Sequence, residues 1–258
     1  MKQKEMHSER DPLSDLKFYS GDITDEDPND LLFADPKAYV TLNALLFDGI
    51  ETEQARAAEG RKLNPAFITR FDTTIALIQG ILSNMHPLQE ETVVFRVERF
   101  SDFNQFERCG MMTSFISCSD AGFLSSYTDK ADLVFMEVHV HPGVLCVRLE
   151  EVLDFYLKKE EHELLIAPYC PIRITSLPVP QKYAHIRDRN GNPVSVYAVV
   201  DVYPSKLKKG CAMEADACQI ASSIRVVEAV NAGAAIDKND LSAYLSFKKK
   251  IQETIRAK

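Results

Sequence analysis

Apolar residues keep a helical spacing through the first third of this chain of 258 residues. Between residues 39 and 46, and again between residues 67 and 81, they recur every three or four positions. Such spacing places them on one face of a helix. We therefore predict helices after the Asp35-Pro36 start, over 52–61, and after Asn64-Pro65.

The middle of the chain carries short β-rich apolar runs that are separated by turn residues. These runs predict strands over 92–97, 111–117, 133–140, 144–148, 164–167 and 171–175. The Asn190-Gly191 dipeptide is typical of a tight turn, so it predicts a hairpin between strands 183–187 and 194–202. Short connections favour a mainly antiparallel, α+β core.

The two ends of the chain differ from this middle. Residues 1–33 are polar and acidic and predict a flexible leader. Near the other end, 213–230 has an apolar stripe, and Asp237 to Asp240 can cap a final helix. The predicted organisation is a flexible leader over 1–33, a main α+β domain with its N-terminal helices over 34–205, and a helical C-terminal extension over 206–258.

Composition narrows the class of function. The net charge of -8 argues against a nucleic-acid partner, which needs a basic surface. No apolar stretch is long enough for a membrane span, and residues 1–11 lack the core of a signal peptide. The six cysteines form no Cys-x-x-Cys pair, so we expect reduced, intracellular thiols. Export by a machine that needs no cleaved signal stays open.

Two glutamates, Glu161 and Glu163, directly precede the apolar run 164–166. Strand periodicity would point both carboxylates to one side where the strand begins. Paired carboxylates can divide the work of stabilising a sugar cation and of activating an acceptor. Considered alone, the pair is better explained by a solvated turn, which is the usual role of two acidic residues beside a strand.

An arginine and a group of hydroxyls lie upstream of these glutamates. Arg96 stands inside an apolar strand, where a guanidinium needs an anion such as a phosphate. An internal ion pair with Glu98 on the same face is the alternative. The run Phe115 to Ser119 then places Ser117 and Ser119 around Cys118 at the end of another strand.

The order of strand arginine, Phe-x-Ser-x-Ser and Glu-x-Glu resembles the mono-ADP-ribosyltransferases of the Arg-Ser-Glu class, which include bacterial toxins and effectors. The resemblance spans roughly 35–202, and 133–143 resembles the family's apolar strand with its Pro-Gly turn. It implies two packed, mainly antiparallel sheets that form an NAD cleft, with helices before them and a helical extension after them.

The resemblance also implies roles for the motif residues. Arg96 would bind an NAD phosphate, and Ser117 would position Glu163. Glu163 would bind the nicotinamide ribose and stabilise its positive charge, whereas Glu161 would orient or deprotonate the acceptor. Val97 stands where the family often has a glycine whose backbone approaches nicotinamide, and Cys118 replaces a threonine.

Aromatic residues near the motifs suit ring stacking or acceptor recognition. Phe123 or Tyr127 would cover the nicotinamide ring, and Phe155 or Tyr156 would contact the acceptor; ordinary packing is the alternative for each.

The resemblance implies a reaction in which ADP-ribose passes from NAD, the co-substrate, to a target protein. It implies no metal. The target would be a host protein if the chain is a bacterial effector or toxin. Glu161 favours an arginine acceptor and is compatible with serine or threonine.

Two other functions compete with this interpretation. Glu137, His139 and His141 alternate along one strand, so they could share a face and bind zinc or iron. The departures at Val97 and Cys118 are also compatible with a catalytically inactive module of the same fold that binds a partner protein. Metal analysis would test the first alternative, and incubation with labelled NAD would test the second.

Overall fold

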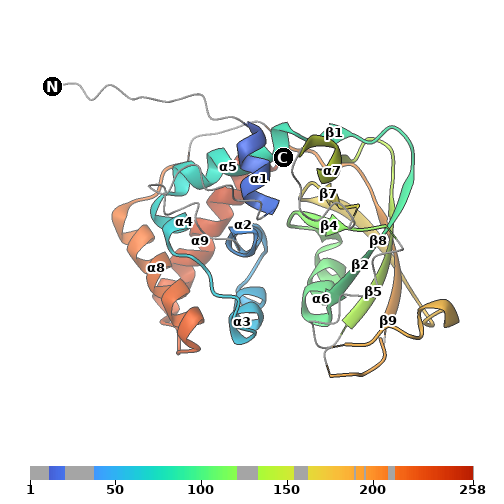
Figure 1. Ribbon diagram of the computed structural model, residues 1–258. Coiled ribbons are helices and arrows are strands. Elements are labelled where there is room, and N and C mark those ends of the chain that lie inside the picture. Colours follow the sequence, from blue (N-terminus) through green and yellow to red (C-terminus); the bar gives the residue numbers. More distant parts are fainter. Residues whose placement is uncertain are drawn as a thin grey trace.

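The computed structural model describes residues 12–20, 38–120, 133–153, 162–188, 190–194, 196–208 and 213–257. Most of its helices gather on one side of the molecule, and its strands gather on the other (Figure 1). The predicted α+β class, with helices at both ends of the chain, is therefore confirmed.

The helices are α1 (Pro12–Ser20), α2 (Ala38–Leu46), α3 (Glu51–Ala58), α4 (Ala66–Thr69), α5 (Phe71–Ser83), α6 (Phe100–Cys109), α7 (Leu149–Val152), α8 (Ala217–Ala232) and α9 (Lys238–Ile255). The strands are β1 (His86–Pro87), β2 (Thr92–Arg99), β3 (Met111–Met112), β4 (Ile116–Cys118), β5 (Leu133–Val140), β6 (Leu145–Arg148), β7 (Leu164–Ile166), β8 (Cys170–Leu177) and β9 (Val196–Val202). A short 3-10 turn covers Gln181–Tyr183.

The strands form two sheets. The smaller sheet has the order β1-β6-β7-β4 and is antiparallel, whereas the larger has the order β2-β5-β9-β8-β3 and contains one parallel pair, β5 with β9. A shared apolar core lies between them, with Cys118 and Leu164 from the smaller sheet and Val94 and Met136 from the larger. The prediction of mainly antiparallel sheets is confirmed.

The two sheets meet where β2 passes the end of β4. Phe95 N donates to Ser119 O at 2.8 Å, and Ser119 N donates back to Phe95 O at 2.9 Å. This single antiparallel bridge brings the strand that carries Arg96 beside the strand that carries Ser117.

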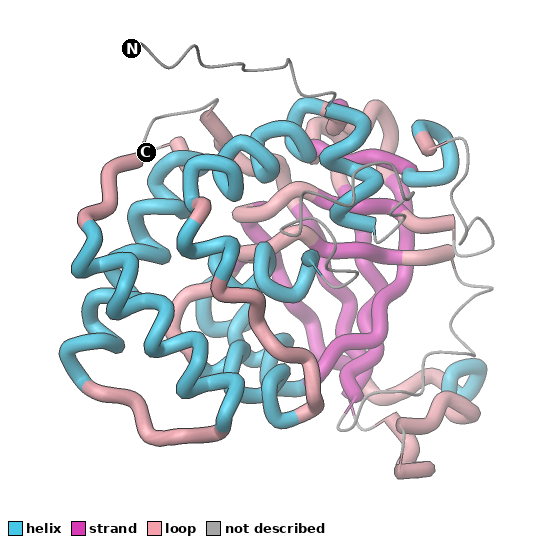
Figure 2. Tube along the Cα trace, turned by 60° about the vertical axis from the view of Figure 1, so that its left-hand side comes forward, coloured by secondary structure: helices cyan, strands magenta, loops and turns pink. Residues whose placement is uncertain are grey.

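Helices from both ends of the sequence share one core. It contains Leu16 of α1, Leu42 of α2 and Ile78 of α5 together with Val227 of α8 and Phe247 of α9. Figure 2 shows these helices together on one side of the strands. The C-terminal helices therefore pack directly against the N-terminal ones, and Asp237 caps α9 as predicted, accepting from Asn239 N and Asp240 N.

The prediction of an unstructured leader is wrong for Pro12–Ser20, which forms helix α1. Leu16 is fully buried, and Phe18 and Tyr19 are at most 7% exposed. The average polarity of the first 33 residues concealed this short apolar group. Burial of these three side chains against α2 and α5 supplies the stability that a nine-residue helix lacks alone.

Replacing Leu16 by alanine is expected to destabilise the protein by about 2–5 kcal/mol, because the truncated side chain leaves a cavity in the helical core. Denaturant unfolding would measure this change. Leu13→Ala, at a half-buried position of the same helix, should have a smaller effect. A loss below about 0.5 kcal/mol for Leu16→Ala, the range of ordinary surface changes, would contradict the packing of α1.

Two strand predictions also need correction. The predicted strand 111–117 is divided between β3 in the larger sheet and β4 in the smaller. The predicted hairpin is reduced to one bridge between Arg187 and Pro193. Strand β9 pairs with β5 and β8 instead, because its two faces are both covered and it can serve as a central strand. A local turn signal does not reveal such long-range pairing.

Candidate active site

Arg96 lies on the inner face of β2, on the same side as Val94, and reaches across the sheet junction. Its Nε donates to Glu98 Oε2 at 2.6 Å, and its Nη1 donates to the backbone oxygen of Ser117 at 2.5 Å. Burial disfavours the charged guanidinium, but the surrounding groups, Glu98 foremost, together outweigh burial and raise the pKa of Arg96. Arg96 therefore remains a cation, and the internal ion pair is present.

Glu98 is fixed at both of its oxygens. Oε2 also lies 2.5 Å from Arg96 Nη2, and Oε1 accepts the backbone N–H of Arg99 at 3.0 Å. The residue is only 1% exposed. A buried carboxylate with these partners holds a neighbouring guanidinium in one orientation.

Ser117 and Glu163 are brought together by the pairing of β4 with β7. Ser117 lies opposite Leu165, and Cys118 lies opposite Leu164. Continuing this register by one residue places Glu163 opposite Ser119. The hydroxyls of Ser117 and Ser119 and the carboxylate of Glu163 therefore belong to one face of the smaller sheet, the face toward the helices.

The entry into β7 is held by local backbone geometry. His162 has a φ of 45°, a left-handed conformation that turns the chain into the strand. The backbone oxygen of Glu163 accepts Leu149 N at 3.1 Å, and Glu163 itself is 8% exposed. This carboxylate is therefore largely removed from water, where its charge acts more strongly on a neighbouring ligand.

Sequence reasoning missed Tyr19 of α1, which approaches the same face of the smaller sheet. Its ring lies 5.3 Å from the ring of Phe115, and its hydroxyl accepts from Asn43 Nδ2 at 3.0 Å. Burial raises the pKa of Tyr19 above its ordinary value, and the negative charge of Glu163 adds to this rise. Only the folding of α1 onto the sheet reveals this neighbour.

The two departures from the family pattern have separate structural roles. Cys118 lies in the core between the sheets, and burial raises the pKa of its thiol to about 12. It is therefore a neutral packing residue. Val97 packs on the opposite face of β2, with Phe135 and Tyr197, so its side chain points away from Arg96.

Several residues singled out in the sequence lie outside the described part of the chain. They are Glu161, Phe123, Tyr127, Phe155 and Tyr156.

Glu137, His139 and His141 share the outer face of β5, as their alternation predicts. His139 Nε2 lies 3.0 Å from Glu137 Oε1, and His141 Nε2 lies 3.2 Å from Asp201 Oδ1. Both Nδ1 atoms face the Glu91 carboxylate, at 3.7 and 3.4 Å. Within the described residues, no group of three or more such side chains is arranged to hold a metal ion.

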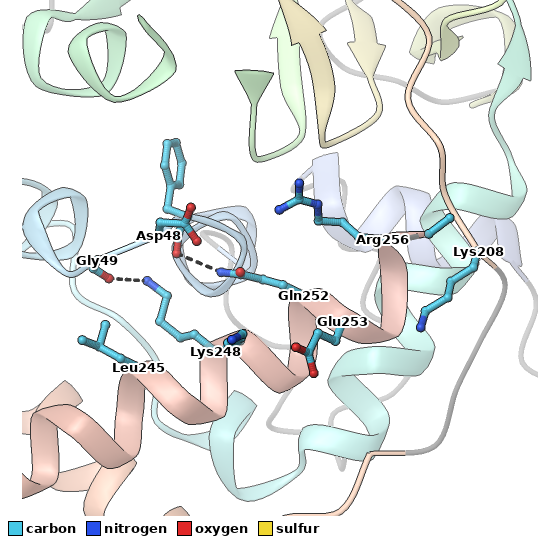
Figure 3. A pocket seen from close by; sticks show the side chains of 11 residues that line it. Asp48, Gly49, Lys208, Leu245, Lys248, Gln252, Glu253 and Arg256 are labelled. Atoms are coloured by element: carbon cyan, nitrogen blue, oxygen red, sulfur yellow. Dashed lines mark hydrogen bonds between the residues drawn. The ribbon is translucent and has the colours of Figure 1, made fainter. Parts of the chain in front are cut away.

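Neither of two further features adds to this site. A cavity of about 850 Å³ between α9 and the loop after α2 is lined by Asp48, Lys208, Lys248, Glu253 and Arg256 among others (Figure 3). Lys248 is already paired with Glu53, and the carboxylates of Asp48 and Glu253 offset most of the remaining positive charge of the lining.

In the described segments, no helix has the length and apolar character needed to cross a membrane.

No protein-family model and no curated protein matches the chain. Among solved structures, it is similar to an ADP-ribosyltransferase from Clostridium botulinum, with 13% identity, 75% of this chain and 87% of that chain covered, and a TM-score of 0.40. The catalytic domain of VsdC from Aeromonas hydrophila is 15% identical, with 75% of this chain and 100% of that chain covered and a TM-score of 0.40. The Vis toxin, an ADP-ribosyltransferase from Vibrio splendidus, is 16% identical, with 73% of this chain and 72% of that chain covered and a TM-score of 0.36. Because these sequence identities and TM-scores are low, the function has to be argued from the side chains of this chain.

Proposed function

We propose that this protein transfers ADP-ribose from NAD to a side chain of a target protein and releases nicotinamide. The observation that supports the proposal is the position of strand β4 between Arg96 and Glu163: Arg96 Nη1 donates to Ser117 O, and β4 pairs with β7, which Glu163 directly precedes. A fixed cation and a largely buried carboxylate, on strands to either side of β4, suit a substrate that carries phosphates beside a sugar.

In the proposed reaction the bond between ribose C1′ and the nicotinamide nitrogen breaks. The bonding electrons move to that nitrogen, so nicotinamide leaves as a neutral molecule and the positive charge moves to the ribose. The carboxylate of Glu163 stabilises this charge more strongly than it stabilises intact NAD, which lowers the barrier. The acceptor then attacks C1′ and gives up its proton.

The other residues hold the substrate in place. Arg96 binds an NAD phosphate through its guanidinium. The hydroxyl of Ser117, on the same sheet face as Glu163, positions that carboxylate. Val97 contributes through its backbone, since its side chain packs away from the inner face. Phe123 or Tyr127 stacks on the nicotinamide ring.

The acceptor step is assigned to Glu161, which orients or deprotonates the target side chain. Arginine is the favoured acceptor, and serine and threonine are the others that fit a glutamate at this position. The target is a protein, and the setting that we propose is a bacterial effector or toxin that reaches a host cell without a cleaved signal peptide. No metal is assigned to the reaction, because Arg96 and Glu163 handle the charges.

The purified protein incubated with NAD is expected to release nicotinamide slowly, because water replaces the acceptor when no target is present. Chromatography of the reaction would quantify nicotinamide, and labelled NAD would report transfer to proteins of a host lysate. Mass spectrometry of the labelled protein would identify the target and the modified residue together. If NAD is neither bound nor cleaved, with or without lysate, the chain is a non-catalytic module instead.

A further inference from the structure

We infer that Glu98 is a positioning residue for the co-substrate. Its carboxylate holds the guanidinium of Arg96 in the one orientation that presents unused N–H donors to a phosphate. This inference rests on the proposed function, because it assigns NAD as the ligand of Arg96. The ion pair and the phosphate site, which are alternatives when the sequence is considered alone, then become two parts of one arrangement.

The donors of Arg96 can be accounted for one by one. A guanidinium has five N–H groups, one on Nε and two on each Nη atom. Glu98 Oε2 accepts one from Nε at 2.6 Å, and Ser117 O accepts one from Nη1 at 2.5 Å. Nη2 turns one side toward Glu98 Oε2, 2.5 Å away, as the ion-pair contact. Among the described residues, the two remaining N–H groups, one on each Nη atom, have no acceptor. Neighbouring donors of this kind match two oxygens of one phosphate.

Glu98 can hold this orientation because it cannot easily move. Its second oxygen accepts Arg99 N, and the residue is 1% exposed. The next arginine has a separate carboxylate, since Arg99 Nε donates to both oxygens of Glu59 at 2.8 Å. Each arginine therefore has its own acidic partner, and Arg99 does not compete for Glu98 Oε2.

A carboxylate beside a phosphate-binding arginine has two opposite effects. Its negative charge weakens the attraction between Arg96 and a phosphate, but its hydrogen bonds fix a long side chain before the ligand arrives. Because two donors have no acceptor in the described part of the chain, NAD can bind without breaking the ion pair. The benefit of a preorganised guanidinium is then retained, and ligand binding loses less side-chain entropy.

The test compares Glu98→Gln with wild type. Calorimetry would give the Kd for NAD, and nicotinamide release would give KM and kcat. We expect Kd and KM to rise about tenfold, the effect of losing one charge-assisted interaction, with kcat within about threefold. Glu59→Gln is the matched control, because it removes the Glu59 carboxylate that pairs with Arg99 and should leave Kd, KM and kcat within about twofold.

Each outcome decides the role of Glu98. An unchanged or lower Kd in a folded Glu98→Gln protein would overturn the inference, and a lower value would identify Glu98 as a competitor of the phosphate. If wild type binds NAD without releasing nicotinamide, the proposed function fails while the Kd comparison still tests Glu98. If wild type binds no NAD, both fail. Should Glu98→Gln not fold, Glu98→Asp replaces it, with a raised Kd expected and an unchanged Kd contradicting the role.

Discussion

Replacing Glu163 by glutamine is expected to lower kcat for nicotinamide release by a factor of about 10² to 10³, with little change in the KM for NAD. The carboxamide has almost the same shape but carries no charge to stabilise the ribose cation. Removal of a single preorganised electrostatic group has an effect of this size in other enzymes. Initial rates measured over a range of NAD concentrations would separate kcat from KM.

Glu151→Gln is a suitable control for this experiment. Glu151 is exposed on α7, close to Glu163 in the sequence, and we assign it no part in the reaction. Its activity should equal that of wild type. A folded Glu163→Gln protein that keeps more than about half of the wild-type kcat would refute the assignment of Glu163.

Replacing Lys248 by methionine is expected to destabilise the protein by about 3–5 kcal/mol, which corresponds to a fall in Tm of about 6–20 °C. Lys248 of α9 pairs with Glu53 of α3, and the two side chains are 2% and 0% exposed. Burial raises the pKa of Glu53, and Lys248 opposes that rise. Without the lysine, a buried acidic group remains with a high desolvation penalty.

Two further variants separate the ion pair from general effects of substitution in α9. Lys249→Met changes the adjacent exposed residue and should alter stability by no more than about 0.5 kcal/mol. Lys248→Met combined with Glu53→Leu removes both charges and should recover much of the loss. If Lys248→Met alone is as stable as Lys249→Met, the C-terminal helices are not held to α3 by this pair.

Strand positions were well predicted where the signal is local. The apolar run 133–140 is strand β5, and the runs after Glu163 and around Arg96 lie in or beside strands as expected. These features depend on neighbouring residues along the chain, which the sequence displays directly.

Features that depend on distant pairing were not predicted. Nothing in the 12–20 segment indicates that Tyr19 lies near Phe115, because that contact joins residues from opposite parts of the fold. The Asn190-Gly191 turn indicated a hairpin, but β9 has better partners in β5 and β8. For the same reason, the division of 111–117 between two sheets could not be seen in its composition.

Sequence reasoning about Arg96 offered an ion pair and a phosphate site as alternatives. The structure contains the ion pair, and it also leaves two N–H donors of the guanidinium without an acceptor among the described residues. Hydrogen-bond geometry, rather than residue type, is needed to see that one arginine can serve both purposes.

A crystal structure of the Glu163→Gln variant with NAD would test the central claim most directly, because slow chemistry should keep the co-substrate intact. We predict a phosphate of NAD within hydrogen-bond distance of the Arg96 Nη atoms and the nicotinamide ribose against residue 163. NAD bound elsewhere, for example in the cavity lined by Lys208 and Arg256, would contradict the assignment of this site.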